Sequence, residues 1–214
     1  MANTLSRLLP FRQYNEQDVI NFYTLNAATG AAGSLVKINT ANLDLDPVTY
    51  VTRGDAYGYL NTIGHASSLY PTVSYTVSKV ELTGEVFSGA ALGIMLRDVR
   101  TVDENGQNLL YYPQKKDELQ CVVSGEAVPV LTKGVLTFTQ TAFTNAGLGG
   151  NHRPSVGDWL VPSTDGAFTG VGTAALKATY KDSKIGVVLA TGTRETTQDT
   201  DFATGFYAMV KIDL

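Results

Sequence analysis

Alternation of apolar and polar residues is the main pattern along this chain. Residues 73–83 alternate almost without fault, which is typical of a strand with one buried face. Similar short runs are rich in Val, Thr, Tyr and Phe and cover 19–25, 35–38, 91–97, 109–112, 119–123, 127–131, 134–138, 159–161, 184–189 and 206–212. Many short strands at this spacing predict an all-β protein, either a β-barrel or a β-sandwich of short antiparallel strands.

Helix is expected to be scarce. Only the stretches around 115–119 and 174–180 can hold one or two helical turns. The strand pattern also predicts a core in one C-terminal barrel, with Trp159 closing one end of it. The residues expected to pack in this core are Val128, Val130, Val135, Phe138, Ile185, Val187 and Leu189.

The first 18 residues differ from the rest of the chain. Their large apolar side chains follow neither a period of 2 nor one of 3.6, and Pro10 prevents a regular helix through this segment. Two interpretations stay open: an extended N-terminal arm that docks on a neighbouring subunit, or a strand folded back on its own domain. On the first interpretation, deleting residues 2–14 leaves the thermal melt of the domain nearly unchanged. The candidate contact residues are Leu5, Arg7, Leu8, Leu9, Phe11, Arg12 and Tyr14.

The charge balance argues against nucleic acid as a partner. The net charge is −4 and the 16 Lys and Arg residues are scattered, whereas phosphate binding needs clustered basic residues. A membrane partner is not expected either, because no stretch approaches the ~20 apolar residues that span a bilayer. The single cysteine, Cys121, is expected to be a small buried side chain in a strand.

No motif for catalysis or cofactor binding stands out in the sequence. His65 and His152 lie in different glycine-containing loops and have no zinc-site spacing with Cys121. Three pairs of acidic residues lack the spacing of a calcium-binding loop. These pairs are Asp44 with Asp46, Asp103 with Glu104, and Asp199 with Asp201. We therefore expect a protein without enzymatic activity, cofactor or metal.

The order of strands and turns in the C-terminal part resembles a known family. Residues 123–138 form a Gly-Glu-x-Val-x-Val…Gly-Val hairpin pattern, followed by Val-Gly-Asp-Trp-Leu-Val at 156–161, Asp-Gly-Ala-Phe-Thr at 165–169 and Lys-Ile-Gly-Val-Val-Leu-Ala-Thr-Gly at 184–192. This succession is similar to the small β-barrel of tailed-bacteriophage capsid decoration (cement) proteins. Residues 14–26 also resemble the first strand of some phage virion proteins.

The resemblance implies a domain organisation and a function. Next to an arm at 1–18, the β-rich domain at 19–214 would contain the barrel at 119–214 and a possible inserted β-subdomain at 48–118. The chain would be a structural virion protein, made in the host cytoplasm, that binds the outer capsid surface and ties capsomers together. Its partners would be the major capsid protein and other copies of itself, as a trimer or as lattice neighbours.

Two alternatives to capsid decoration stay open. The first is another virion component, such as a tail tube, connector or spike. The second is a carbohydrate-binding β-module, because eleven tyrosines and Trp159 offer aromatic faces on which sugar rings stack.

Overall fold

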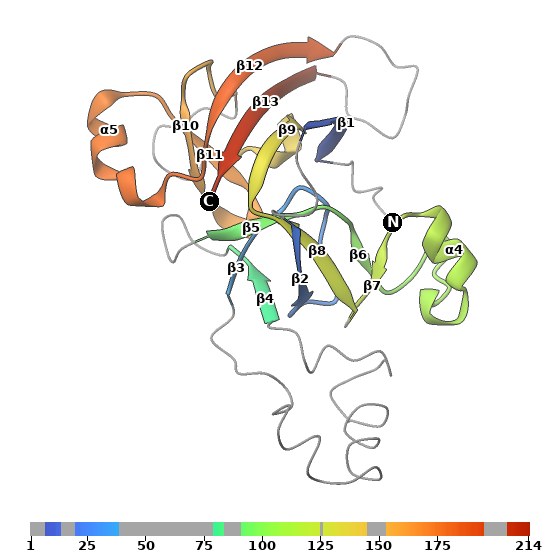
Figure 1. Cartoon of the computed structure of the whole chain (residues 1–214). Helices are drawn as coiled ribbons and strands as arrows, with labels where there is room; N and C mark the ends of the chain where they lie inside the picture. The colour runs from blue at the N-terminus through green and yellow to red at the C-terminus, as the bar shows by residue number, and fades with distance from the viewer. Residues whose placement is uncertain are drawn as a thin grey trace, which may run out of the picture.

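The structure consists mainly of short strands (Figure 1), which confirms the predicted all-β class. The computed structural model describes residues 7–13, 20–38, 79–83, 91–124, 126–144, 153–194 and 205–214. These residues form a closed barrel, a six-stranded sheet packed against it and a two-stranded sheet. Both regions expected to hold helical turns contain one short helix, α4 (Pro113–Glu118) and α5 (Ala174–Thr179).

The barrel draws its strands from the N-terminal half of the chain and from one later segment. Its strand order is β2-β4-β3-β5-β8, and all neighbours are antiparallel except β2 with β4. A cluster of buried side chains from all five strands fills it, with Val36 and Val80 among them. Gly93 lets β5 approach β8 closely, because a Cβ there would lie 2.6 Å from the carbonyl oxygen of Leu131. The strands are β2 (Ile20–Leu25), β3 (Leu35–Ile38), β4 (Lys79–Leu82), β5 (Ala91–Met95) and β8 (Ala127–Leu131).

The six-stranded sheet is formed mainly by the C-terminal part of the chain. Its order is β1-β9-β13-β12-β10-β11, with every neighbouring pair antiparallel. In the long hairpin of β12 and β13, the ring of Tyr207 lies across Gly192 and covers a position without a side chain. The strands are β1 (Leu8–Gln13), β9 (Lys133–Thr139), β10 (Trp159–Pro162), β11 (Phe168–Val171), β12 (Gly186–Arg194) and β13 (Gly205–Asp213).

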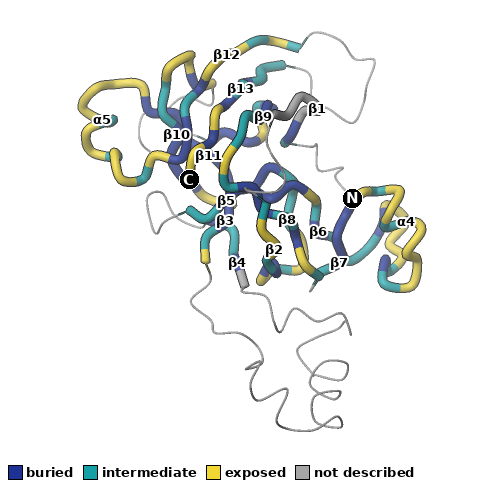
Figure 2. The backbone as a smooth tube through the Cα atoms, viewed as in Figure 1, coloured by how far each residue is buried: buried dark blue, intermediate teal, exposed yellow. Residues whose placement is uncertain are grey.

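Barrel and sheet are joined by a shared core, where the buried segments gather in Figure 2. In β3, β5 and β8, two consecutive residues are buried, one in the barrel cluster and the other against the sheet. These pairs are Val36 with Leu35, Met95 with Ile94, and Val130 with Leu131. Successive side chains point to opposite faces of a strand. The three strands are therefore buried on both faces at these pairs, which explains why each carries two adjacent apolar residues there.

An excursion between β5 and β8, residues 96–126, carries its own small core. It contains β6 (Val99–Arg100), the 3₁₀ turn η1 (Leu109–Tyr111), α4 and β7 (Val122–Val123), and β6 pairs in parallel with β7. The segment 109–112, expected as a strand, turns helically because the side chain of Asn108 accepts a hydrogen bond from Leu110 N. None of the helices in the described ranges is long and apolar enough to cross a membrane.

The barrel is not where the resemblance placed it. Of residues 119–214, only β8 is a barrel strand. A strand inside a closed barrel needs a partner on each side, and the partners of β8 are β2 and β5, which come from earlier in the chain. Within the predicted subdomain at 48–118, β4 and β5 are integral barrel strands, while 48–78 lie outside the described residues.

The predicted core is correct at some positions and wrong at others. Phe138 and Ile185 are buried in the core shared by barrel and sheet, and Val128 and Val130 are buried in the barrel cluster. Val135 and Val187 are half-buried, and Leu189 is 43% exposed. The core face of β12 contains Val188 instead, and the register shifts between Val188 and Ala190, so the side chains after it do not continue a simple alternation.

Trp159 does not close a barrel. It lies half-buried on β10 in the six-stranded sheet, where it pairs with Val171 and Val187. The neighbouring residue Leu160 is the one that enters the core. The side chain of Trp159 is therefore on the opposite face of the sheet from the core.

Candidate interaction surfaces

Part of the predicted N-terminal contact segment belongs to the protein's own sheet. Leu8–Gln13 form β1, which pairs antiparallel with β9. Leu8 lies opposite Phe138, is 2% exposed and belongs to the core shared by barrel and sheet. For β1, the structure therefore agrees with a strand folded back on its own domain. The prediction that Leu8 contacts a partner is wrong, because its side chain is already covered.

The other predicted contact residues are distributed differently. Arg7, just before β1, donates a hydrogen bond of 3.4 Å from Nη1 to the carbonyl oxygen of Asp165 in its own chain. Burial lowers the pKa of Arg7, and the negative charge of Asp165 acts against this shift. Leu9, Phe11 and Arg12 lie in β1, whereas Leu5 and Tyr14 lie outside the described residues.

The edge strand β1 is poorly suited to pairing with another chain. Leu8 pairs with Phe138 and Arg12 with Leu136, so four steps along β1 match two along β9 and the register shifts between them. Pro10, within this irregular part, has no backbone N–H. Irregular register and proline both protect edge strands from joining other sheets. The β1 edge is therefore an unfavourable place for a partner strand to join the sheet.

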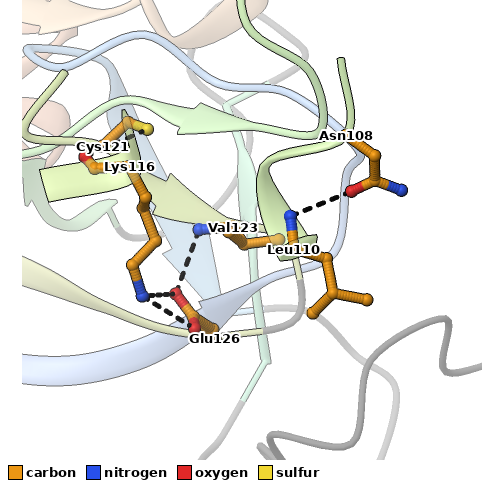
Figure 3. A network of polar contacts seen from close by, with 6 residues as sticks. All are labelled: Asn108, Leu110, Lys116, Cys121, Val123 and Glu126. Carbon is orange, nitrogen blue, oxygen red and sulfur yellow. Dashed lines mark hydrogen bonds and ion pairs between the residues drawn. The ribbon is translucent and has the colours of Figure 1, made fainter. Parts of the chain in front are cut away.

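Charged groups anchor the excursion at 96–126. Asp98 Oδ1 accepts a hydrogen bond of 2.6 Å from Ala32 N, and its Oδ2 lies 2.7 Å from Arg100 Nη2. Figure 3 shows a second anchor, where Lys116 Nζ lies 3.1 and 3.2 Å from the two carboxylate oxygens of Glu126. Glu126 Oε2 also accepts from Val123 N at 3.1 Å. Each carboxylate therefore binds both a cation and a backbone N–H. The Asp98 contacts tie the start of the excursion to Ala32, and the Glu126 contacts hold α4 against β7.

Two adjacent tyrosines project from this anchored excursion. Tyr111 is 73% exposed and Tyr112 is 49% exposed, and both precede α4, which begins at Pro113. Tyrosine is enriched at protein interfaces, because its ring buries a large area with few rotatable bonds. Treating 109–112 as a strand missed this surface, since a strand would direct the two rings to opposite faces. The sequence signal that identifies this surface is a proline followed by polar residues, which marks the start of a helix.

A second surface lies beside α5. The ring centroid of Trp159 is 4.9 Å from Lys184 Nζ and 5.7 Å from Lys177 Nζ, the latter on α5. Val187 lies opposite Trp159, and Lys211 lies opposite Val187 on the next strand. Directly opposed residues of neighbouring strands share a face of the sheet. Trp159, Val187 and Lys211 therefore form one row, which makes this surface both aromatic and basic.

Of the acidic pairs and histidines considered in the sequence, the structure describes Asp103 and Glu104. Asp103 is buried, and its Oδ1 accepts hydrogen bonds of 2.8 Å from both Asn105 N and Gln107 N, so this carboxylate stabilises a turn. Glu104 Oε2 lies 3.5 Å from Lys115 Nζ and forms an ion pair with it. No three potential metal ligands come together among the residues that the structure describes. The remaining candidates, Asp44, Asp46, His65, His152, Asp199 and Asp201, lie outside those residues.

Cys121 is expected to react slowly with alkylating reagents in the native protein. Its side chain is buried, as the sequence predicted, although Cys121 lies just before β7 and not in a strand. Burial raises the pKa of the thiol. The thiolate, which is the reactive form, is therefore scarcer at pH 8 than in an unfolded chain. We expect labelling by iodoacetamide, followed by mass spectrometry, to be about tenfold or more slower than in protein unfolded with urea. Equal rates in the two states would contradict this burial.

Comparisons of the chain with protein-family models, with curated proteins and with solved structures found no match. The geometry itself defines an all-β protein of barrel and sheet. It displays an exposed tyrosine pair on an anchored excursion and a basic aromatic surface beside α5. Both features suit the binding of other macromolecules.

Proposed function

We propose that this protein is a structural subunit of a virus particle and acts by binding other proteins. The exposed pair Tyr111 and Tyr112 on the anchored excursion carries the proposal. Rigid, exposed aromatic side chains are effective interface anchors, because little conformational entropy is lost when a partner covers them. The resemblance of residues 123–192 to phage decoration proteins supplies the specific form. In that form the subunit binds the outer capsid surface and holds capsomers together.

The distribution of exposed apolar residues supports a subunit with several neighbours. Ile38 is exposed on the barrel, the tyrosine pair on the excursion, and Leu189 on the sheet. Single exposed apolar residues are ordinary on protein surfaces. On a lattice, however, several weak contacts made by one subunit add up to strong binding, because each contact holds the others in place.

Carbohydrate binding has less support from the geometry. Trp159 is the obvious stacking platform, but Lys184 Nζ lies 4.9 Å from its ring centroid. A sugar would have to compete with this cation for the ring. A tail-tube, connector or spike protein would use the same kind of contact surface, and only its copy number separates it from a decoration protein.

The first test of the proposal is the number of copies in a particle. Quantitative mass spectrometry of purified particles from the phage that encodes the chain is expected to find it in hundreds of copies, in a constant ratio to the major capsid protein. A number matching a single ring would favour a tail or connector component. Absence from the particles would overturn the proposal.

The second test is binding of variants to particles that lack the protein. The double substitution Tyr111→Ser and Tyr112→Ser is expected to weaken binding by about tenfold or more, because it removes two anchor side chains. Phe22→Ser, which removes an exposed ring from the barrel, is the matched control. Unchanged affinity of the double variant would show that the excursion contacts neither the shell nor a neighbouring copy of the subunit.

A further inference from the structure

The surface around Trp159 carries uncompensated positive charge. We call the set Trp159, Lys177, Lys184 and Lys211 the basic face. Within the described ranges, neither Lys184 nor Lys211 has a carboxylate at ion-pair distance. The nearby Asp213 is held by Lys133 at 3.0 Å. The pKa of the Asp213 carboxyl group is lowered mainly by its hydrogen bond with Lys133. The positive charges of Lys133, Lys211 and Lys184 lower it further. A protein with a net charge of −4 thus concentrates lysines on one surface.

The end of the excursion has the opposite character. We call the set Tyr111, Tyr112, Asp117 and Glu118 the acidic tip. Lys115 Nζ lies 3.7 Å from Glu118 Oε2 and 3.5 Å from Glu104 Oε2, so one lysine forms ion pairs with two carboxylates. Asp117 is exposed and adds a third negative charge, while the neighbouring Lys116 is already paired with Glu126. The tip therefore combines excess negative charge with two exposed rings.

The two surfaces are separated within one molecule. Figure 1 shows α4, which carries the acidic tip, and α5, which borders the basic face, at opposite ends. One chain therefore cannot bring its own tip to its own face. Pairing through the β1 edge of the sheet is also disfavoured, because β1 contains Pro10 and a shifted register.

We propose that copies of this chain bind one another head to tail, with the acidic tip of one copy on the basic face of the next. The carboxylates of Asp117 and Glu118 pair with lysines of the face, and the tyrosine rings supply apolar area and attract the ammonium groups. The contact joins two different surfaces, so a pair of copies still has one free tip and one free face. Further copies can add there, and the assembly grows into an open chain or closes into a ring. The inference rests on the proposed assembly role and names the surfaces that copies use for each other.

Sedimentation velocity of the full chain tests this contact. We expect the sedimentation coefficient to rise with protein concentration at low salt and less so at 0.5 M salt, since exposed charges are screened. A face variant carries Lys184→Glu and Lys211→Glu, and a tip variant carries Asp117→Lys and Glu118→Lys. All four side chains are exposed, so both variants are expected to keep the parent's melting temperature. Each variant alone is expected to associate about tenfold or more weakly.

Mixing the two variants gives the decisive result. The face variant retains an acidic tip and the tip variant retains a basic face, so an equal mixture is expected to associate more strongly than either variant alone. The control exchanges Lys37 and Glu81, which form a 3.2 Å ion pair on the barrel, as Lys37→Glu with Glu81→Lys. This control is expected to associate like the parent.

Three results would overturn the head-to-tail contact. They are a parent that stays monomeric at all concentrations, variants that associate like the parent, and a mixture that stays dissociated. A monomeric parent whose face variant fails to bind particles would assign the basic face to the shell instead. These outcomes are independent of copy number in particles, so self-association and the proposed function can fail separately.

Discussion

Replacing Phe138 by alanine is expected to destabilise the protein by about 3–5 kcal/mol. Phe138 is fully buried, and its ring centroid lies 4.9 Å from that of Phe168 and 6.3 Å from that of Phe143. These rings occupy the core where the barrel meets the sheet. The substitution removes apolar area from this core and leaves a cavity that the rigid strands around it cannot close. Urea unfolding monitored by circular dichroism measures the loss.

The matched control for this prediction is Phe22→Ala. It deletes the same atoms from a side chain that is 61% exposed on β2. The expected loss is about 1 kcal/mol or less, because little area is withdrawn from water at this position. Equal losses for the two variants would contradict the described core.

Replacing Leu8 by alanine is expected to destabilise the protein by about 2–5 kcal/mol. Leu8 is buried where β1 pairs with β9, and it packs in the same core as Phe138. Deleting residues 2–14 should destabilise the protein at least as much, since it removes the whole strand as well. This outcome replaces the expectation that the deletion leaves the melt nearly unchanged.

The control for Leu8 is Leu189→Ala, which makes the same chemical change on β12. Leu189 is 43% exposed, so its truncation is expected to cost about 1 kcal/mol or less. Thermal melts of both variants and of the deletion give the comparison. If Leu189→Ala proved the more damaging, the side-chain facing assigned to β12 and the burial of β1 would both be wrong.

Local patterns in the sequence were sufficient for the class and for many of the elements. Alternating apolar residues identified strands such as β2 and β13, and both short helices fell where helical turns were expected. The burial of Cys121 also followed from its residue type. These properties depend on neighbours within a few positions, where the period of the apolar residues distinguishes a strand from a helix.

The tertiary structure alone decided which face of a strand is buried when both faces carry apolar residues. In β12, Val188 and Leu189 are equally apolar, yet only Val188 enters the core. Val188 lies opposite Val210 of β13, which is itself buried in this core, so the next residue, Leu189, points to the other face. In the same way, Leu8 lies in a segment without a clear period and is buried because β9 lies beside it.

The candidate surfaces were even less accessible to sequence reasoning. Trp159, Val187 and Lys211 share one row of the sheet only because β10, β12 and β13 are neighbours. The acidic tip depends on a helical turn before α4 that keeps both tyrosines exposed. Composition and period predict that strands form, because those properties are local. The order of the strands follows from which apolar faces bury one another best, and this comparison involves residues far apart in the chain.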